Sequence, residues 1–154
     1  MSIRSVSKAI IISNNNILLN QCVRRDGSVY YALPGGGQHQ YENMEKAVIR
    51  EVREETGYQV RVVRLAGVVE EIEPDEVMRS QFPEYTHRIM HLFIVEIVGQ
   101  ATDELLEKDF EMDKCIWFPI TELDKLPEFV PHGIKERLVD LIYSNSITYW
   151  ETNE

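Results

Sequence analysis

The sequence predicts an α/β domain in which a sheet packs against helices. Short apolar segments rich in Val and Ile recur along the 154-residue chain, and two further segments carry apolar residues at helical spacing. A chain of this length with 44% hydrophobic residues can build one sizeable core. Because the chain has no internal repeat, low-complexity segment or linker-like composition, we expect residues 1–154 to form a single domain.

The first part of the chain predicts paired strands. The segments "SVSKAIIIS" (5–13) and "NILLNQCVR" (16–24) have the apolar content of strands and are joined by a polar turn. The next segment, "RRDGSVYYAL" (24–33), predicts a hairpin, because Asp26-Gly27 is a strong two-residue turn signal.

The clearest helix is predicted over residues 44–56. Asn43 can cap its N-terminus, and Gly57 can end it in the left-handed conformation. The remaining expected elements are strands over 58–72, 88–98 and 114–120, loops over 73–86 and 99–113, an amphipathic helix over 133–144, and a mobile tail over 146–154.

Charge and cysteine content narrow the class of protein. The formal net charge of −10 argues against a nucleic acid polymer as partner, since such binding draws on Lys and Arg to neutralise phosphates. No segment has the length of a membrane span or the layout of a secretory signal. The two cysteines, Cys22 and Cys115, lack partners at metal-binding spacing and are expected to be buried reduced thiols. We therefore expect a soluble cytoplasmic protein that does not bind membranes and that handles any phosphate through metal ions.

The predicted helix over 44–56 carries clustered glutamates. At about 100° per residue, Glu51, Glu54 and Glu55 share an arc of about 100° directly beside the apolar face formed by Val48 and Val52. Like charges at these spacings destabilise a helix, and a divalent cation would compensate them. Hard oxygen ligands without cysteine or a histidine pair suit Mg²⁺ or Mn²⁺.

Arg50 lies one turn before Glu54 and can pair with it, which would hold that carboxylate in one rotamer. The alternative is an ordinary solvated acidic helix, with Arg50 and Arg53 as surface partners. Ahead of the helix, the run Gly35–Gly37 allows positive φ and lets a ligand or the helix approach the backbone. By itself such a run indicates only a turn.

The glycines and the glutamates together form a longer pattern. It resembles the Nudix box of the Nudix (MutT-like) hydrolases, GX5EX7REUXEEXGU, in which U is a bulky aliphatic residue. The matching fixed positions are Gly36, Glu42, Arg50, Glu51, Glu54, Glu55 and Gly57. Val52 takes the first U position, whereas Tyr58 departs from the second. The segments "LPGGG" (33–37) and "WFPITEL" (117–123) also resemble the family.

This resemblance implies an α/β/α sandwich around a mixed sheet, with the box as a loop–helix–loop. It also implies hydrolysis of a pyrophosphate bond in a nucleoside diphosphate linked to another group. Glu51, Glu54 and Glu55 would bind the divalent metal, with Glu42 contributing directly or through water. Arg50 would orient a glutamate. The loop-shaping glycines would be Gly36, Gly37 and Gly57.

The general base is left open by the sequence. In the family it is a box glutamate or a glutamate on a later loop, and here the later loop offers Glu104, Glu107 and Glu111. Of these three we favour Glu111, because it directly precedes a strand expected to approach the site. The box glutamates Glu51 and Glu54 are the stronger candidates.

The substrate is also left open. We expect a nucleoside or deoxynucleoside triphosphate first and a nucleotide sugar such as ADP-ribose second; Pro74 resembles a mark of the ADP-ribose-hydrolysing branch. The rival hypotheses are a non-catalytic nucleotide-binding Nudix domain and an acidic domain that stores or senses cations. His39, Arg4, Arg24 and Arg25 are secondary candidates for phosphate contacts. A homodimer, common in the family, is expected by resemblance only.

Overall fold

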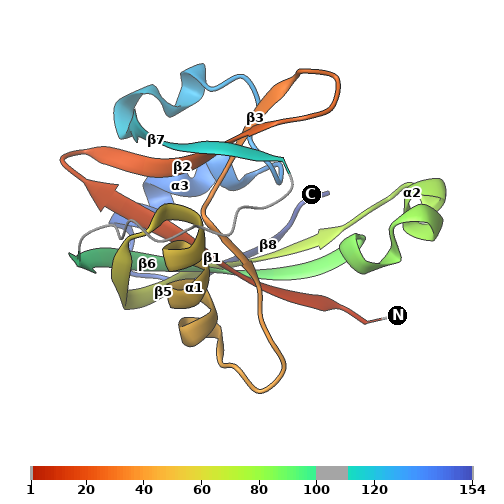
Figure 1. The fold of residues 1–154 in the computed structure, drawn as a ribbon, viewed down its shortest axis with the longest axis horizontal. Coiled ribbons are helices and arrows are strands. Elements are labelled where there is room, and N and C mark those ends of the chain that lie inside the picture. Colours follow the sequence, from red (N-terminus) through yellow and green to blue (C-terminus); the bar gives the residue numbers. More distant parts are fainter. Residues whose placement is uncertain (1, 100–110, 154) are drawn as a thin grey trace.

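The computed structural model describes residues 2–99 and 111–153, which form a mixed sheet flanked by helices (Figure 1). The strands are β1 (Arg4–Ser13), β2 (Asn16–Val23), β3 (Val29–Ala32), β4 (Gly35–Gly37), β5 (Gln59–Ile72), β6 (His87–Gly99), β7 (Met112–Pro119) and β8 (Thr148–Glu151). The helices are α1 (Met44–Thr56), α2 (Glu76–Gln81) and α3 (Ile134–Tyr143), with two 3-10 helices, η1 (Pro83–Tyr85) and η2 (Ile120–Lys125). None of the described helices is long and apolar enough to cross a membrane.

The sheet runs in the order β3-β2-β1-β6-β5-β8, and β4 and β7 add to β1 and β2 respectively. Two pairings are parallel, β1 with β6 and β5 with β8, and the others are antiparallel. The expected mixed sheet is therefore confirmed.

Two apolar layers hold this sheet between helices. On one face, Val48 and Val52 of α1 pack with a cluster that includes Ala9 and Ile11 of β1. On the other face, α3 and η2 contribute to a larger cluster, in which Leu138 is fully buried. Because successive strand residues point to opposite faces, β1 supplies both layers. This arrangement confirms the α/β/α sandwich.

Local signals in the sequence set several boundaries. Asn14 and Asn15 both have positive φ, at 48° and 61°, in the turn between β1 and β2. Gly27 has a φ of 86° in the predicted hairpin turn. Helix α1 begins after Asn43, whose side chain accepts a hydrogen bond from the Lys46 N–H, and ends at Gly57 with a φ of 78°.

The glycine run is a strand where the sequence indicates only a turn. Gly35–Gly37 pairs antiparallel with β1. At Gly35, whose φ is +140°, a Cβ would lie 2.1 Å from the Ser7 carbonyl oxygen. Only glycine lets the two strands approach this closely here.

The sequence predicts a mobile tail over 146–154, and within the described residues 146–153 this expectation is wrong. Residues Thr148–Glu151 form β8, which pairs in parallel with β5. Trp150 anchors the strand, since its side chain is 2% exposed and the Arg137 guanidinium lies 4.6 Å from its ring centroid. The strand was not predicted because the segment is short and only Trp150 of its apolar residues is buried.

The expected loop over 73–86 contains a short helix, α2. Asp75 caps this helix by accepting from the N–H groups of Val77 and Met78. In Figure 1, α2 stands out at one end of the molecule, beyond the paired strands β5 and β6. Of the second loop, over 99–113, residues 100–110 lie outside the described part of the chain, and with them Glu104 and Glu107.

Candidate active site

Helix α1 holds the clustered carboxylates against the sheet. Its apolar residues Ala47, Val48 and Val52 are fully buried. The helix contacts β1, β4 and β5, so its charged flank faces the glycine strand and the loop that precedes the helix. Because the apolar face of α1 is buried against the sheet, the position of the glutamates beside that face is fixed as well.

Arg50 joins three of these carboxylates. Its Nε and Nη2 donate to the two oxygens of Glu42 at 2.8 and 2.9 Å. Its Nη1 donates to Glu51 at 2.9 Å and to Glu54 at 3.1 Å, and Nη2 also donates to the Gly37 carbonyl at 2.9 Å. We call Arg50 with Glu42, Glu51 and Glu54 the Arg50 cluster. One guanidinium thus brings together groups from the loop and from two turns of the helix.

The same contacts shift the acid–base properties of the cluster. The pKa of Glu42 is lowered to about 2, chiefly because Arg50 donates to its carboxylate and secondarily because the His39 backbone N–H does so. The pKa of Arg50 is raised, first by the hydrogen bond to Glu42 and then by that to Glu51. Both groups are held in their charged forms.

Gly36 allows the Glu51 carboxylate to lie against β4. A Cβ at Gly36 would stand 2.6 Å from both Cδ and Oε2 of Glu51. Such a distance is shorter than any normal contact, so a side chain here would displace the carboxylate. The glycine of the box is therefore explained by the position of this glutamate.

Glu55 has a different environment from the Arg50 cluster. It is 2% exposed, and its Oε1 accepts the Gly35 N–H at 2.7 Å while Oε2 accepts from Asn20 Nδ2 at 2.6 Å. The carboxylate thereby ties the end of α1 to β4 and β2. The role of Asn20 was missed from the sequence, although a polar residue inside the apolar run "NILLNQCV" was an available signal.

The donor chemistry of the cluster suits a hard divalent cation, because all of its acidic groups offer carboxylate oxygens. Within residues 2–99 and 111–153, however, no group of three His, Cys, Asp or Glu side chains is arranged so that it could hold a metal ion. The Arg50 guanidinium supplies the positive charge between the carboxylates instead. The assignment of Glu42, Glu51, Glu54 and Glu55 as metal ligands stays a prediction.

Glu111 lies apart from the Arg50 cluster, where its Oε2 accepts the Tyr30 hydroxyl at 2.6 Å. Burial and then this hydrogen bond raise the pKa of Tyr30. Glu111 and Tyr30 share the lining of a cavity of about 140 Å³ with Asn20, which contacts Glu55. The later-loop candidate for the base is thus linked to the box through Asn20, which contacts Glu55.

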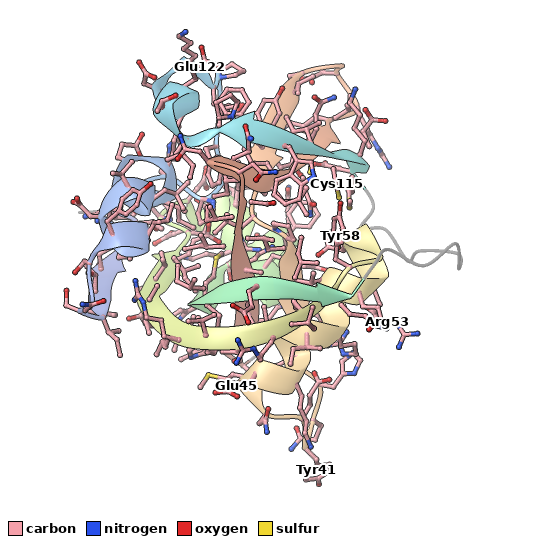
Figure 2. All side chains as sticks on the ribbon, turned by 90° about the vertical axis from the view of Figure 1, so that its left-hand side faces the viewer. Tyr41, Glu45, Arg53, Tyr58, Cys115 and Glu122 are labelled. Carbon is pink, nitrogen blue, oxygen red and sulfur yellow. The ribbon has the colours of Figure 1, made fainter. Side chains whose placement is uncertain are left out.

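A larger cavity, of about 930 Å³, adjoins the loop before α1 and is lined in part by Arg4, His39 and Glu42. It brings two of the secondary phosphate candidates beside the cluster. Arg24 instead pairs with Glu128. Figure 2 shows Tyr41 at the tip of the same loop, pointing away from the body of the molecule, where it is 99% exposed.

Tyr58, the departure from the box pattern, packs as an aromatic residue. Its ring meets that of Trp117 edge to face, with 6.1 Å between centroids and 64° between planes. Tyr58 and Cys115, both labelled in Figure 2, pack on the apolar layer beneath α1. An aromatic side chain therefore serves here where an aliphatic one is usual.

Comparison with known proteins gives consistent results. The family model described as NUDIX domain matches residues 3–138. An ADP-ribose pyrophosphatase of Methanocaldococcus jannaschii is 34% identical over 120 residues, and an NAD-capped RNA hydrolase NudC of Pseudomonas fluorescens is 28% identical over 142 residues. The matches cover 76% and 92% of this chain but only 62% and 45% of those relatives. In fold, the chain is similar to a solved NUDIX hydrolase from Nitrosomonas europaea, with a TM-score of 0.74, 20% identity, and coverage of 93% and 90% of the two chains.

Proposed function

Because the chain belongs to the Nudix family, we propose that it hydrolyses a pyrophosphate bond in a nucleoside diphosphate linked to another group, with a divalent metal. The observation that carries this proposal is the Arg50 cluster, in which the box carboxylates are gathered beside the glycine strand. Members of the family generally use divalent metal ions, and we propose Mg²⁺ or Mn²⁺ here.

The chemistry explains why such a site is needed. A pyrophosphate resists attack because its oxygens are negative, and this chain has a net charge of −10. A bound divalent ion would neutralise the phosphate oxygens and position the attacking water. Glu51, Glu54 and Glu55 would hold it, with Glu42 directly or through water.

The chain's own residues would orient and move protons. Arg50 would hold Glu51 and Glu54 in fixed rotamers through the contacts of its Nη1. Glu54 is the most exposed member of the cluster at 32%, against 13% for Glu51, and is the better placed of the two to take a proton from water. We therefore propose Glu54 as the base, with Glu111 as the alternative.

Two substrate classes are candidates, nucleoside triphosphates and nucleotide sugars such as ADP-ribose. The sequence ranks nucleoside triphosphates first. Two features favour ADP-ribose: the archaeal relative named ADP-ribose pyrophosphatase, at 34% identity, and Pro74, which resembles a mark of that branch. The expected homodimer stays a prediction, which light scattering of the purified protein would test.

The deciding experiment incubates the protein with nucleoside triphosphates, ADP-ribose, dinucleoside polyphosphates and NADH, each with Mg²⁺ or Mn²⁺ and with a chelator. We expect cleavage only with metal. Pyrophosphate from triphosphates would identify the first class, and AMP with a sugar phosphate the second. A folded protein that binds metal and nucleotide but cleaves none of these compounds would overturn the proposal in favour of a binding domain.

A further inference from the structure

A buried hydroxyl group lies in the strand beneath α1 without a hydrogen-bond partner. It belongs to Ser7, which is part of β1 and is fully buried. Among the residues that the structure describes, no group forms a hydrogen bond with the Ser7 Oγ. Burying a hydroxyl without a partner costs free energy, so such groups are rare in folded proteins. The hydroxyl of Ser7 therefore indicates a role other than stabilising the fold.

The side chain of Ser7 points towards α1. Ala9 and Ile11, two and four residues further along β1, both pack in the apolar layer beneath this helix. Because successive strand residues point to opposite faces, Ser7 lies on the same face as Ala9 and Ile11. A polar residue at such a position departs from the apolar pattern of a buried strand face, and departures of this kind are expected at functional sites.

Ser7 is also a neighbour of the Glu51 carboxylate. It is paired directly with Gly36 in the antiparallel ladder between β1 and β4. Directly opposed residues of such a ladder share a face, with their Cβ positions about 4.5–5.5 Å apart. The Glu51 carboxylate fills the space over Gly36, since a Cβ there would stand 2.6 Å from its Oε2. The Ser7 hydroxyl and the Glu51 carboxylate therefore lie side by side beneath α1.

Two side chains could accept the Ser7 hydroxyl after a small movement. One is Glu51, whose Oε1 accepts from Arg50 Nη1 at 2.9 Å in the structure. The other is His91, the neighbour of Ser7 in the parallel ladder with β6, whose Nδ1 lies 3.1 Å from the Val6 carbonyl oxygen. Glu51 is the stronger acceptor, because a hydrogen bond to a carboxylate is charge-assisted.

We infer that Ser7 is a positioning residue for Glu51, which accepts the Ser7 hydroxyl when its carboxylate turns from Arg50 to hold a divalent ion. The inference rests on the metal-binding role proposed above for Glu51 and adds to it a residue outside the box. The new hydrogen bond would fix the orientation of the carboxylate and offset the lost contact with Arg50. Loss of a hydrogen-bond partner of a metal ligand commonly weakens metal binding about 10- to 100-fold.

The test measures the affinity for Mn²⁺ by electron paramagnetic resonance in the wild type, Ser7→Ala and Ser13→Ala. Ser13 is the matched control, because it lies on the same face of β1 about 20 Å further along the strand. Ser7→Ala should raise the Kd for Mn²⁺ about tenfold, whereas Ser13→Ala should leave it within about twofold. In chelator, the melting temperature of Ser7→Ala should be no lower than that of the wild type, because no hydrogen bond is lost. A folded Ser7→Ala protein with the Mn²⁺ affinity of the wild type would overturn the inference.

A second measurement identifies the acceptor of the hydroxyl. In a Glu51→Ala background, Ser7→Ala should change the Kd for Mn²⁺ by less than about twofold, because the carboxylate that Ser7 positions is gone. In a His91→Gln background, Ser7→Ala should keep its full effect of about tenfold. An effect of that size that persists without the Glu51 carboxylate would assign the hydroxyl to another acceptor and refute the inference.

Both measurements read metal binding and need no turnover, so the inference and the proposed function can fail separately. Weaker Mn²⁺ binding by Ser7→Ala, in a protein that cleaves none of the panel compounds, would keep the positioning role and reject the hydrolase. Metal-dependent cleavage, with equal Mn²⁺ affinities of the wild type and Ser7→Ala, would do the reverse.

Discussion

The Nudix box carries two kinds of carboxylate, and they differ in the groups that hold them. Glu42, Glu51 and Glu54 are partly exposed and converge on the side chain of Arg50. Glu55, adjacent in sequence to Glu54, is buried and is held by the backbone N–H of Gly35 and the amide of Asn20. The partner of the first group is a partly exposed side chain, whereas one partner of Glu55 is the backbone N–H of a strand. The comparison indicates that the Arg50 cluster is arranged for chemistry and that Glu55 is needed first for the architecture of the site.

The largest expected effect is a loss of activity at Glu54 without a loss of stability. Glu54→Gln should lower kcat by about 10³-fold, because an amide is a poor ligand for Mg²⁺ and a poor base. Thermal unfolding should be nearly unchanged, since the residue is partly exposed. Steady-state kinetics and a melting curve check both parts. Full activity with undiminished Mg²⁺ dependence would remove Glu54 from the site.

The second prediction concerns a substitution at Gly36 that should displace the Glu51 carboxylate while leaving Glu51 itself unchanged. Gly36→Ala places a methyl group 2.6 Å from Glu51, which should lower kcat/KM about 10- to 100-fold by misplacing the carboxylate. Gly27→Ala is the matched control. Its φ of +86° makes alanine unfavourable, yet no atom lies within 4 Å of its Cβ, so it should cost stability of about 1 kcal/mol and no activity. Equal activities of the two variants would contradict this account of Gly36.

Glu55 gives the third prediction, which concerns stability. Both its oxygens accept hydrogen bonds, so Glu55→Gln must set an amide N–H₂ against a donor. We expect a loss of about 1–3 kcal/mol in the free energy of unfolding, measured by urea denaturation. Glu45→Gln, at an exposed site in the first turn of α1, should change it by less than about 0.5 kcal/mol. If Glu55→Gln is as stable as the wild type, the division between the two kinds of carboxylate fails.

The smallest expected effect is the pH dependence of the Glu42–Arg50 pair. The pKa of Glu42 is about 2, below its ordinary value, so the pair stabilises the fold above pH ~4.5 and loses this contribution as pH falls towards 2. In chelator, Glu42→Gln should be less stable than the wild type at pH 7 by on the order of 1 kcal/mol. This difference should shrink steadily from pH 5 to pH 3 in urea unfolding. A difference that grows on acidification would contradict the sign.

Local chemistry made much of this molecule predictable from sequence. Helix α1 begins and ends where Asn43 and Gly57 predict, because caps act within a few residues. The turn at Asp26-Gly27 was predictable for the same reason, because turn residues also act locally. The contact between Arg50 and Glu54 was likewise predictable, since it follows from helical spacing.

Contacts between distant segments were not predictable in this way. The glycine run becomes β4 only because β1 lies beside it, and β8 exists only against β5. The link from Asn20 to Glu55 likewise joins two segments that no periodicity relates. The sequence could place residues on an element, but it could not say which elements meet.

The strand order has a consequence for synthesis of the chain. Strand β1 finds its parallel partner only when β6 has been made, and the outer edge of β5 is covered only by β8, the last strand described. An emerging chain therefore exposes unpaired strand edges until β8 has left the ribosome. Such long-range pairing slows folding and invites association between chains. This topology therefore requires that the unpaired edges of β1 and β5 be protected from other chains during synthesis.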